Sequence, residues 1–175
     1  MAARVGWRTV VVMAGVFPMS AAASWQPGLE WGITDNRSEF VRVIVSGPRS
    51  FDLGETGAWS WRWTPEIDLG RWFHDFADHD LWELGVTPVL EAKRSIQEGE
   101  LGFNLGIGAH VLSDIQFDGD KLATSFQFGD HLGVDWRFAD THWSVGYRFQ
   151  HLSNGGIKSP NEGVNFHILH LAWQF

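Results

Sequence analysis

Apolar and polar residues alternate with a period of two over much of the chain after position 24. The run Trp59-Ser60-Trp61-Arg62-Trp63 alternates cleanly, and residues 101–108 do the same with small or polar residues on the second face. Successive side chains of a β-strand point to opposite faces, so this rhythm predicts strands with one apolar and one polar face.

The longest alternations lie in the second half of the chain, in residues 126–138, 143–150 and 168–175. Their apolar faces hold Phe126, Phe128, Leu132, Val134, Trp136 and Phe138, then Trp143, Val145, Tyr147 and Phe149, and finally Leu169, Leu171, Trp173 and Phe175. Asp130 interrupts the first of these faces. An acid among apolar residues needs a partner, which a lipid headgroup or a neighbouring strand could supply.

About eight such segments follow one another, and eight strands is the smallest size usual for outer-membrane barrels. The expected turns lie near residues 36–38, 47–50, 70–80, 94–99, 114–122, 139–141 and 154–163. None of these segments is long enough for a membrane-spanning helix, so a mature chain that enters a membrane must do so as a closed barrel. We therefore predict an all-β fold, an eight-stranded antiparallel transmembrane β-barrel of the outer-membrane type. Its polar faces would line the interior, and its aromatic-rich faces would meet lipid.

The alternative is a small soluble barrel of the lipocalin type, whose apolar faces point inward around a ligand. The chain ends on a strand that finishes at Phe175, with Trp173 two residues earlier. This ending resembles the terminal strand by which outer-membrane barrels are recognised for insertion. Together with the two-faced strands, it favours the membrane barrel.

The first residues have the pattern of a secretory signal peptide. Arg4 and Arg8 precede an apolar run over residues 9–17, and Ala21-Ala22-Ala23 supplies the small residues of a cleavage site. The apolar run is too short to cross about 30 Å of hydrocarbon as a helix, which argues against an uncleaved anchor. We predict a signal peptide over residues 1–23 and one barrel domain over residues 24–175.

Composition narrows the classes of function. The chain has 11 Trp, 13 Phe, one Tyr, no Cys and a formal net charge of −8. An acidic chain without a basic stripe is a poor candidate for binding nucleic acid. The absence of Cys excludes disulfides and Cys-ligated metals. The histidines lack the tight spacing of a zinc site, so we expect no metal.

One polar pair lies where chemistry on a lipid is feasible. If both chain ends are periplasmic, the seventh strand ends at the cell surface near residues 150–153, and the loop 154–163 is extracellular. His151 and Ser153 are two apart on this strand, so they share a face with Cα atoms about 6.6 Å apart. Their parity is that of the lipid-facing residues, which places them beside the lipopolysaccharide of the outer leaflet. Neutral imidazole could take the serine proton and create a nucleophile. The alternative is an interfacial polar pair at headgroup depth.

The next residues could stabilise a developing oxyanion. Asn154 and the backbone N–H of Gly156 follow Ser153 directly, and Gly155-Gly156 lets the backbone turn toward a reacting carbonyl. A glycine turn that closes a hairpin is the alternative, and the two roles are compatible.

Several runs of this sequence resemble those of a known family. The matching runs are His151-Leu152-Ser153-Asn154-Gly155-Gly156-Ile157-Lys158, Pro160-Asn161-Glu162-Gly163-Val164-Asn165-Phe166, and upstream segments near 84–90, 106–110, 126–133 and 146–151. They are similar to the lipid A 3-O-deacylases, the PagL family. The likeness is strongest from about residue 84 onward, and the first strands match only in pattern.

The resemblance implies an eight-stranded outer-membrane barrel that hydrolyses the ester at position 3 of lipid A, with its active site on the outer wall. It implies that His151 is the general base, that Ser153 is the nucleophile, and that Asn154 and Gly156 form the oxyanion hole. A glutamate of the family triad aligns with Asn165, which can orient an imidazole but carries no charge. We prefer Asn165 as the orienting residue because it shares the parity of His151. The charged Glu162 is the other candidate.

The expected partners are lipopolysaccharide and the bilayer, with no nucleic acid and no cofactor, and the sequence leaves a homodimer open. Two rival functions remain. The missing glutamate fits a non-catalytic structural or adhesive barrel, and another lipid hydrolase such as a phospholipase would carry a similar site. The His-x-Ser-Asn spacing favours the deacylase.

Overall fold

The structure is a computed structural model that describes residues 25–35, 38–47, 51–73, 80–117 and 120–174. The predicted signal peptide 1–23 and Phe175 lie outside the described residues. The described chain is built of β-strands. They are β1 (Gln26–Thr34), β2 (Glu39–Ser46), β3 (Phe51–Thr56), β4 (Trp59–Phe73), β5 (Leu81–Ile96), β6 (Gly99–Leu112), β7 (Gln116–Phe117), β8 (Asp120–Lys121), β9 (Phe126–Phe138), β10 (Trp143–Ser153) and β11 (Val164–Trp173). No helix among the described residues is long and apolar enough to cross a membrane.

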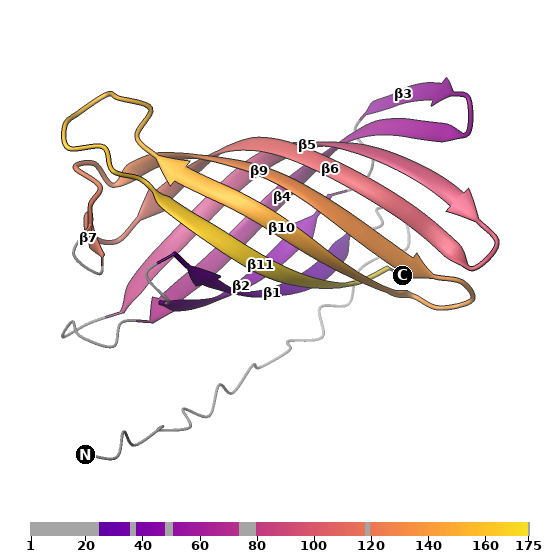
Figure 1. Ribbon diagram of the computed structural model, residues 1–175, viewed down its shortest axis with the longest axis horizontal. Helices are drawn as coiled ribbons and strands as arrows, with labels where there is room; N and C mark the ends of the chain where they lie inside the picture. The colour runs from indigo at the N-terminus through magenta and orange to yellow at the C-terminus, as the bar shows by residue number, and fades with distance from the viewer. Residues whose placement is uncertain (1–24, 36–37, 48–50, 74–79, 118–119, 175) are drawn as a thin grey trace, which may run out of the picture.

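The main sheet closes on itself as an antiparallel barrel of eight strands (Figure 1). Around the wall the order is β1, β2, β4, β5, β6, β9, β10 and β11, and β11 pairs again with β1. The first and last strands are joined over seven residue pairs, from Gly28 with Ala172 to Thr34 with Phe166. The predicted fold class is therefore confirmed.

The second wall position is formed by β2 and β3 together. Both pair antiparallel with β4, since Ser46 lies opposite Glu66 and Phe51 opposite Trp63. The two segments therefore run in the same direction, and the turn expected at 47–50 is wrong as a point of chain reversal. Residues 48–50 lie outside the described residues, and the reversal falls between Thr56 and Trp59. β2 ends at Ser46, two residues before the proline of the sequence, which lacks the N–H that a ladder needs.

The expected turns at 70–80 and 94–99 are also shorter in the structure than in the prediction. β4 continues to Phe73, and β5 continues to Ile96. Both extensions are paired with a neighbouring strand, which stabilises residues whose types alone suggest a loop.

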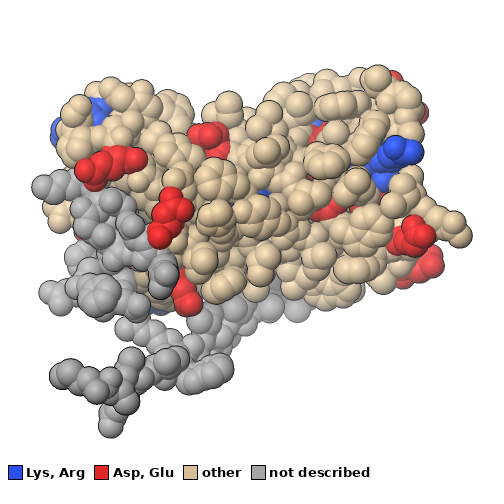
Figure 2. All heavy atoms as spheres, in the orientation of Figure 1, with Lys and Arg blue, Asp and Glu red and all other residues tan. Residues whose placement is uncertain are grey.

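The outer wall is apolar and the interior is polar. Large apolar side chains are exposed around the outside, among them Trp31, Leu69, Leu84, Ile107, Leu132 and Leu169. Figure 2 shows one face of this wall, on which charged side chains gather mainly toward the two ends. This distribution is that of a barrel surrounded by lipid rather than of a soluble barrel around an apolar ligand.

Buried ion pairs cross the lumen. Arg42 Nη1 donates to Glu30 Oε2 at 2.9 Å, and Arg42 Nη2 donates to Glu83 Oε1 at 3.0 Å. Arg148 Nη1 donates to Glu66 Oε2 at 2.7 Å. These residues come from five different strands, so the network ties opposite walls together.

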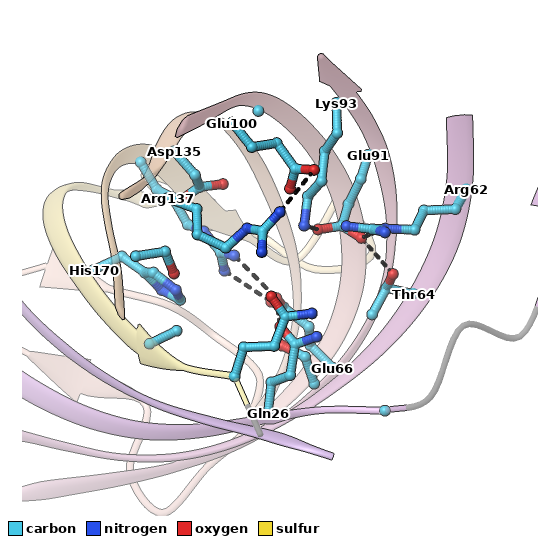
Figure 3. Close-up of a pocket in the computed structure, with 17 residues that line it drawn as sticks. Gln26, Arg62, Thr64, Glu66, Glu91, Lys93, Glu100, Asp135, Arg137 and His170 are labelled. Atoms are coloured by element: carbon cyan, nitrogen blue, oxygen red, sulfur yellow. Dashed lines mark hydrogen bonds and ion pairs between the residues drawn. The ribbon is translucent and has the colours of Figure 1, made fainter. Parts of the chain in front are cut away.

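A polar cavity of about 50 Å³ lies nearer the short-turn end of the lumen (Figure 3). There Glu91 accepts hydrogen bonds from Arg62 Nε at 2.6 Å and Thr64 Oγ1 at 2.5 Å, and it lies 3.0 Å from Lys93 Nζ. This space suits a few water molecules.

The two ends of the barrel differ. The strand ends Thr34, Phe73, Leu112 and Ser153, each followed by one of the longer connections, lie at one end, and the short turns 57–58, 97–98 and 139–142 lie at the other (Figure 1). Apolar side chains fill the lumen beneath the longer connections. This plug consists of Phe40, Trp72, Leu81, Leu112, Leu122, Leu152, Val164, Phe166 and Ile168. It gives the end of β10 a rigid support.

Candidate active site

His151 and Ser153 lie at the end of β10 that faces the longer connections. Both side chains are partly exposed on the outer wall, whereas Leu152 between them is fully buried in the apolar plug. The alternation along β10 thus turns the imidazole and the hydroxyl to the same side, where parity predicts them. Leu152 fixes the strand that carries them.

His151 lies directly opposite Asn165 in the β10–β11 pair. Its Nδ1–H donates to Asn165 Oδ1, with the two atoms 2.7 Å apart. Asn165 is outward-facing because Val164 and Phe166 on either side belong to the plug. Of the two orienting candidates, the structure thus brings Asn165 to the imidazole. The other candidate, Glu162, is exposed in the loop 154–163.

The amide of Asn165 continues into a longer polar chain. Its Nδ2–H donates to Asp35 Oδ2 at 2.6 Å. The other oxygen of Asp35 lies 3.8 Å from His167 Nε2, and His167 Nδ1 is hydrogen-bonded to the Tyr147 hydroxyl at 2.6 Å. This chain runs along the outer wall over β10, β11 and the turn after β1.

The loop returns to the barrel close against the imidazole. Gly163 has φ +73, and a Cβ at this position would lie 2.6 Å from His151 Cε1 and 3.0 Å from Nε2. A left-handed backbone and the nearby ring both require glycine here. Gly163 therefore leaves room for the edge of the ring that carries Nε2.

Ser153 is flanked by apolar side chains. It lies opposite Phe128 in the β9–β10 pair, and Phe126, Phe128 and Phe149 are exposed on the same wall. A hydrogen bond between Ser153 and His151 is not among those formed by the described residues. Catalytic hydrogen bonds are often long without substrate and tighten in the complex. The structure shows the two side chains on the same face of β10.

The turn after Ser153 differs from the expectation of two open oxyanion donors. Asn154 is fully buried, and its Nδ2 donates to Leu122 O at 3.0 Å and to Lys158 O at 2.8 Å. Its backbone N–H donates to Asn161 Oδ1 at 2.8 Å. The Gly156 N–H in turn donates to Asn154 Oδ1 at 2.9 Å. Asn154 braces the loop because the parity that turns Ser153 outward turns the next residue inward.

Carboxylates also lie beside this site and in the lumen. Asp130 lies opposite His151 on β9 and is exposed on the outer wall. In the lumen, Asp68, Glu83 and His110 could offer three ligand atoms to a metal. The Arg42 guanidinium already contacts this lumen cluster, with Nε 3.4 Å from Asp68 Oδ1. A cation beside the carboxylates favours an ion-pair network over a metal centre.

Sequence reasoning missed Asp35 and Gly163. Asp35 is 130 residues from Asn165, and only the pairing of β1 with β11 brings them together. Closing the predicted barrel on paper would have placed the first turn beside the last strand. Gly163 belongs to a matched motif, but its contact with the imidazole requires coordinates.

Comparisons with known proteins identify a family and a related fold. The family model described as Lipid A 3-O-deacylase (PagL) matches residues 44–174. This range includes His151, Ser153 and Asn165 but not Asp35. A solved structure described as the outer membrane enzyme PagL has a TM-score of 0.78 and 22% identity, and the match covers 86% of this chain and 99% of that one.

Two curated relatives share part of the sequence. The lipid A deacylase PagL of Bordetella bronchiseptica is 32% identical over 64% of this chain and 62% of the relative. The protein of the same name from Pseudomonas aeruginosa is 38% identical over 37% of this chain and 36% of the relative. The matched segments thus span less than two thirds of these relatives. The family model covers most of the chain, and the chain belongs to the lipid A 3-O-deacylase (PagL) family.

Proposed function

We propose that the protein is an outer-membrane serine esterase that hydrolyses the ester-linked acyl chain at position 3 of lipid A. The observation that carries this proposal is the placement of His151 and Ser153 on one face of the outer wall, with His151 held by Asn165 at 2.7 Å. Membership of the family and the names of the two relatives support the substrate.

The proposed reaction uses protein groups and water. The His151 Nδ1–H is engaged by Asn165, so Nε2 acts as the base and takes the proton of Ser153. Ser153 Oγ then attacks the acyl carbonyl, and the tetrahedral intermediate collapses as the sugar oxygen leaves with the proton from His151. Water, deprotonated by the same imidazole, hydrolyses the acyl-enzyme and releases a free fatty acid.

We assign the Gly156 N–H to the oxyanion, with the Asn154 side chain holding the turn that carries it. In the structure without substrate, Asn154 Oδ1 accepts the Gly156 N–H at 2.9 Å. The oxyanion would replace this oxygen as the acceptor in the reaction. Removal of one preorganised oxyanion donor, a side-chain amide, costs about 3–4 kcal/mol of transition-state stabilisation in another hydrolase.

The proposed location follows from the apolar wall and the predicted signal peptide. Outer-membrane barrels place short turns in the periplasm and longer loops outside. The end that carries His151 and Ser153 would then lie at the outer leaflet, where lipopolysaccharide is the neighbouring lipid. The bilayer and lipopolysaccharide are the proposed partners.

The test is release of fatty acid from lipid A by the purified, detergent-solubilised protein, followed by mass spectrometry. We expect the wild type and Ser144→Ala to release a 3-hydroxy fatty acid, and Ser153→Ala and His151→Ala to release none. Ser144 is the matched control because it lies at the other end of β10. Release from phospholipid with intact lipid A would identify a phospholipase instead. No release from either lipid would favour the non-catalytic barrel.

A further inference from the structure

We propose that Asp35 is a positioning residue that selects the tautomer of His151 through the amide of Asn165. The inference rests on the proposed function, in which His151 is the general base. Asp35 lies in the turn after β1, and its contact with Asn165 is a hydrogen bond of 2.6 Å from Nδ2 to Oδ2.

The Asp35 carboxylate fixes the orientation of the Asn165 amide. An amide has an NH₂ that donates and an oxygen that accepts, and an ionised carboxylate can only accept. Asp35 therefore requires the NH₂ of Asn165 to face it. This orientation leaves Asn165 Oδ1 as the atom that faces His151 Nδ1.

The orientation of the Asn165 amide in turn fixes the tautomer of the His151 imidazole. Because Asn165 Oδ1 can only accept, His151 Nδ1 must carry the hydrogen, and the lone pair is left on Nε2. A flipped amide would present its NH₂ to Nδ1 and would place the hydrogen on Nε2. That tautomer cannot take the serine proton. The orientation of one amide thus decides whether the base is available.

Neither the Asn165 amide nor the His151 imidazole can select the tautomer alone. A glutamate in place of Asn165 would impose the same tautomer by itself, since both of its oxygens accept. Asparagine presents two nearly isosteric orientations and needs a neighbour that accepts only. Asp35 supplies this neighbour from the opposite end of the chain, across the closure of β1 on β11.

Asp35 is itself held from a second side. Its Oδ1 lies 3.8 Å from His167 Nε2, and the Tyr147 hydroxyl is 2.6 Å from His167 Nδ1. The Asp35 side chain is 55% exposed, so water screens its charge and its effect on the imidazolium is weak. Orientation of the amide is therefore its main contribution. Among the described residues nearby, the titratable Asp130 lies opposite His151 on β9, and the titratable Glu162 is exposed in the loop 154–163.

The decisive experiment reads the tautomer directly. ¹⁵N-histidine-labelled protein in micelles, at about pH 8.5 where an ordinary imidazole is neutral, gives separate nitrogen shifts for N–H and lone-pair nitrogens. His151→Gln identifies the His151 signals. We expect the wild type and Glu39→Gln to show Nδ1–H alone, and Asp35→Ala to show a mixture of tautomers. Glu39 is the matched control because it is an exposed carboxylate near the same end of the barrel.

An activity measurement gives an independent readout. We expect Asp35→Ala to lower kcat on lipid A about 10- to 100-fold with KM unchanged, by analogy with residues that orient a metal-ligating histidine. Placing Asn165→Glu in the Asp35→Ala chain should restore kcat, because the glutamate needs no neighbour. A merely structural loss in the turn would not be rescued in this way.

The inference is overturned if Asp35→Ala keeps pure Nδ1–H, or if the wild type already carries the hydrogen on Nε2. A wild type that releases no fatty acid would instead disprove the proposed function. In that case the nitrogen shifts still decide whether Asp35 sets the tautomer, so the two failures are separate.

Discussion

Asn165 donates a hydrogen bond to Asp35, a residue that precedes it by 130 positions. The contact exists because the barrel closes, with Thr34 opposite Phe166 in the pair of β1 and β11. The closure therefore does more than remove sheet edges. It joins the first turn of the chain to the last strand at the point where His151 is held.

Gly163→Ala tests whether the returning loop positions the imidazole. The new Cβ would lie 2.6 Å from His151 Cε1, so the ring must move, and a displacement of about 1 Å can reduce turnover about 100-fold. Gly57→Ala is the control, since Gly57 has φ +62 and open space around its Cβ position. We expect kcat on lipid A to fall in Gly163→Ala alone. Equal activity in both variants would contradict the role of Gly163.

Asn165→Leu removes the acceptor of the His151 Nδ1–H while keeping a similar volume. We expect kcat to fall about 10- to 100-fold, because the imidazole loses its orientation. Asn165→Glu should keep activity, and its carboxylate favours the imidazolium. The acidic limb of its kcat/KM profile should therefore move to higher pH than in the wild type. Unchanged kcat in Asn165→Leu would show that another group orients His151.

Leu132→Arg tests the lipid-facing assignment of the outer wall. Leu132 is 62% exposed in the middle of β9, and an arginine at the bilayer midplane costs about 2–4 kcal/mol. Ile157→Arg is the control, since Ile157 is 66% exposed in the loop 154–163. Urea unfolding in lipid vesicles should show the loss of stability for Leu132→Arg only. A similar small effect in both variants would place the wall of β9 in water.

Arg42→Met tests the ion pairs of the lumen. The variant removes the guanidinium that pairs with Glu83 and leaves Glu30 with Arg148 as its remaining guanidinium partner, and breaking a buried pair costs about 3–5 kcal/mol. Arg71→Met breaks an exposed pair with Asp80, for which about 0–1 kcal/mol is expected. The free energy of unfolding in vesicles measures both. If Arg42→Met is as stable as Arg71→Met, the network does not hold the opposite walls together.

The strand pattern predicted the barrel because lipid and lumen impose opposite polarity on alternate residues. Leu132 and Val134, which parity assigns to the apolar face, are exposed on the outer wall. The turn at 47–50 was wrong because a proline interrupts a strand as readily as it reverses one, and only the pairing with β4 distinguishes the two cases.

The alternation along strands predicts which face a site residue occupies. The contacts that site residues make in loops could not be predicted from the sequence. His151, Ser153 and Asn165 share a face because their strands alternate, and their positions follow from counting. The buried position of Asn154 follows from the same parity, yet its bonds to Leu122 O and Lys158 O depend on how two loops pack. Contacts between residues on different loops follow no regular spacing in the sequence, so the sequence alone does not predict them.

The most direct test of the central claim is the mass of lipid A from cells that express the protein. With the wild type, we predict the loss of one 3-hydroxyacyl chain from position 3, and with Ser153→Ala we predict lipid A of unchanged mass. The same loss in cells with Ser153→Ala, at an equal level of folded protein, would contradict the assignment of Ser153 on the outer wall as the nucleophile.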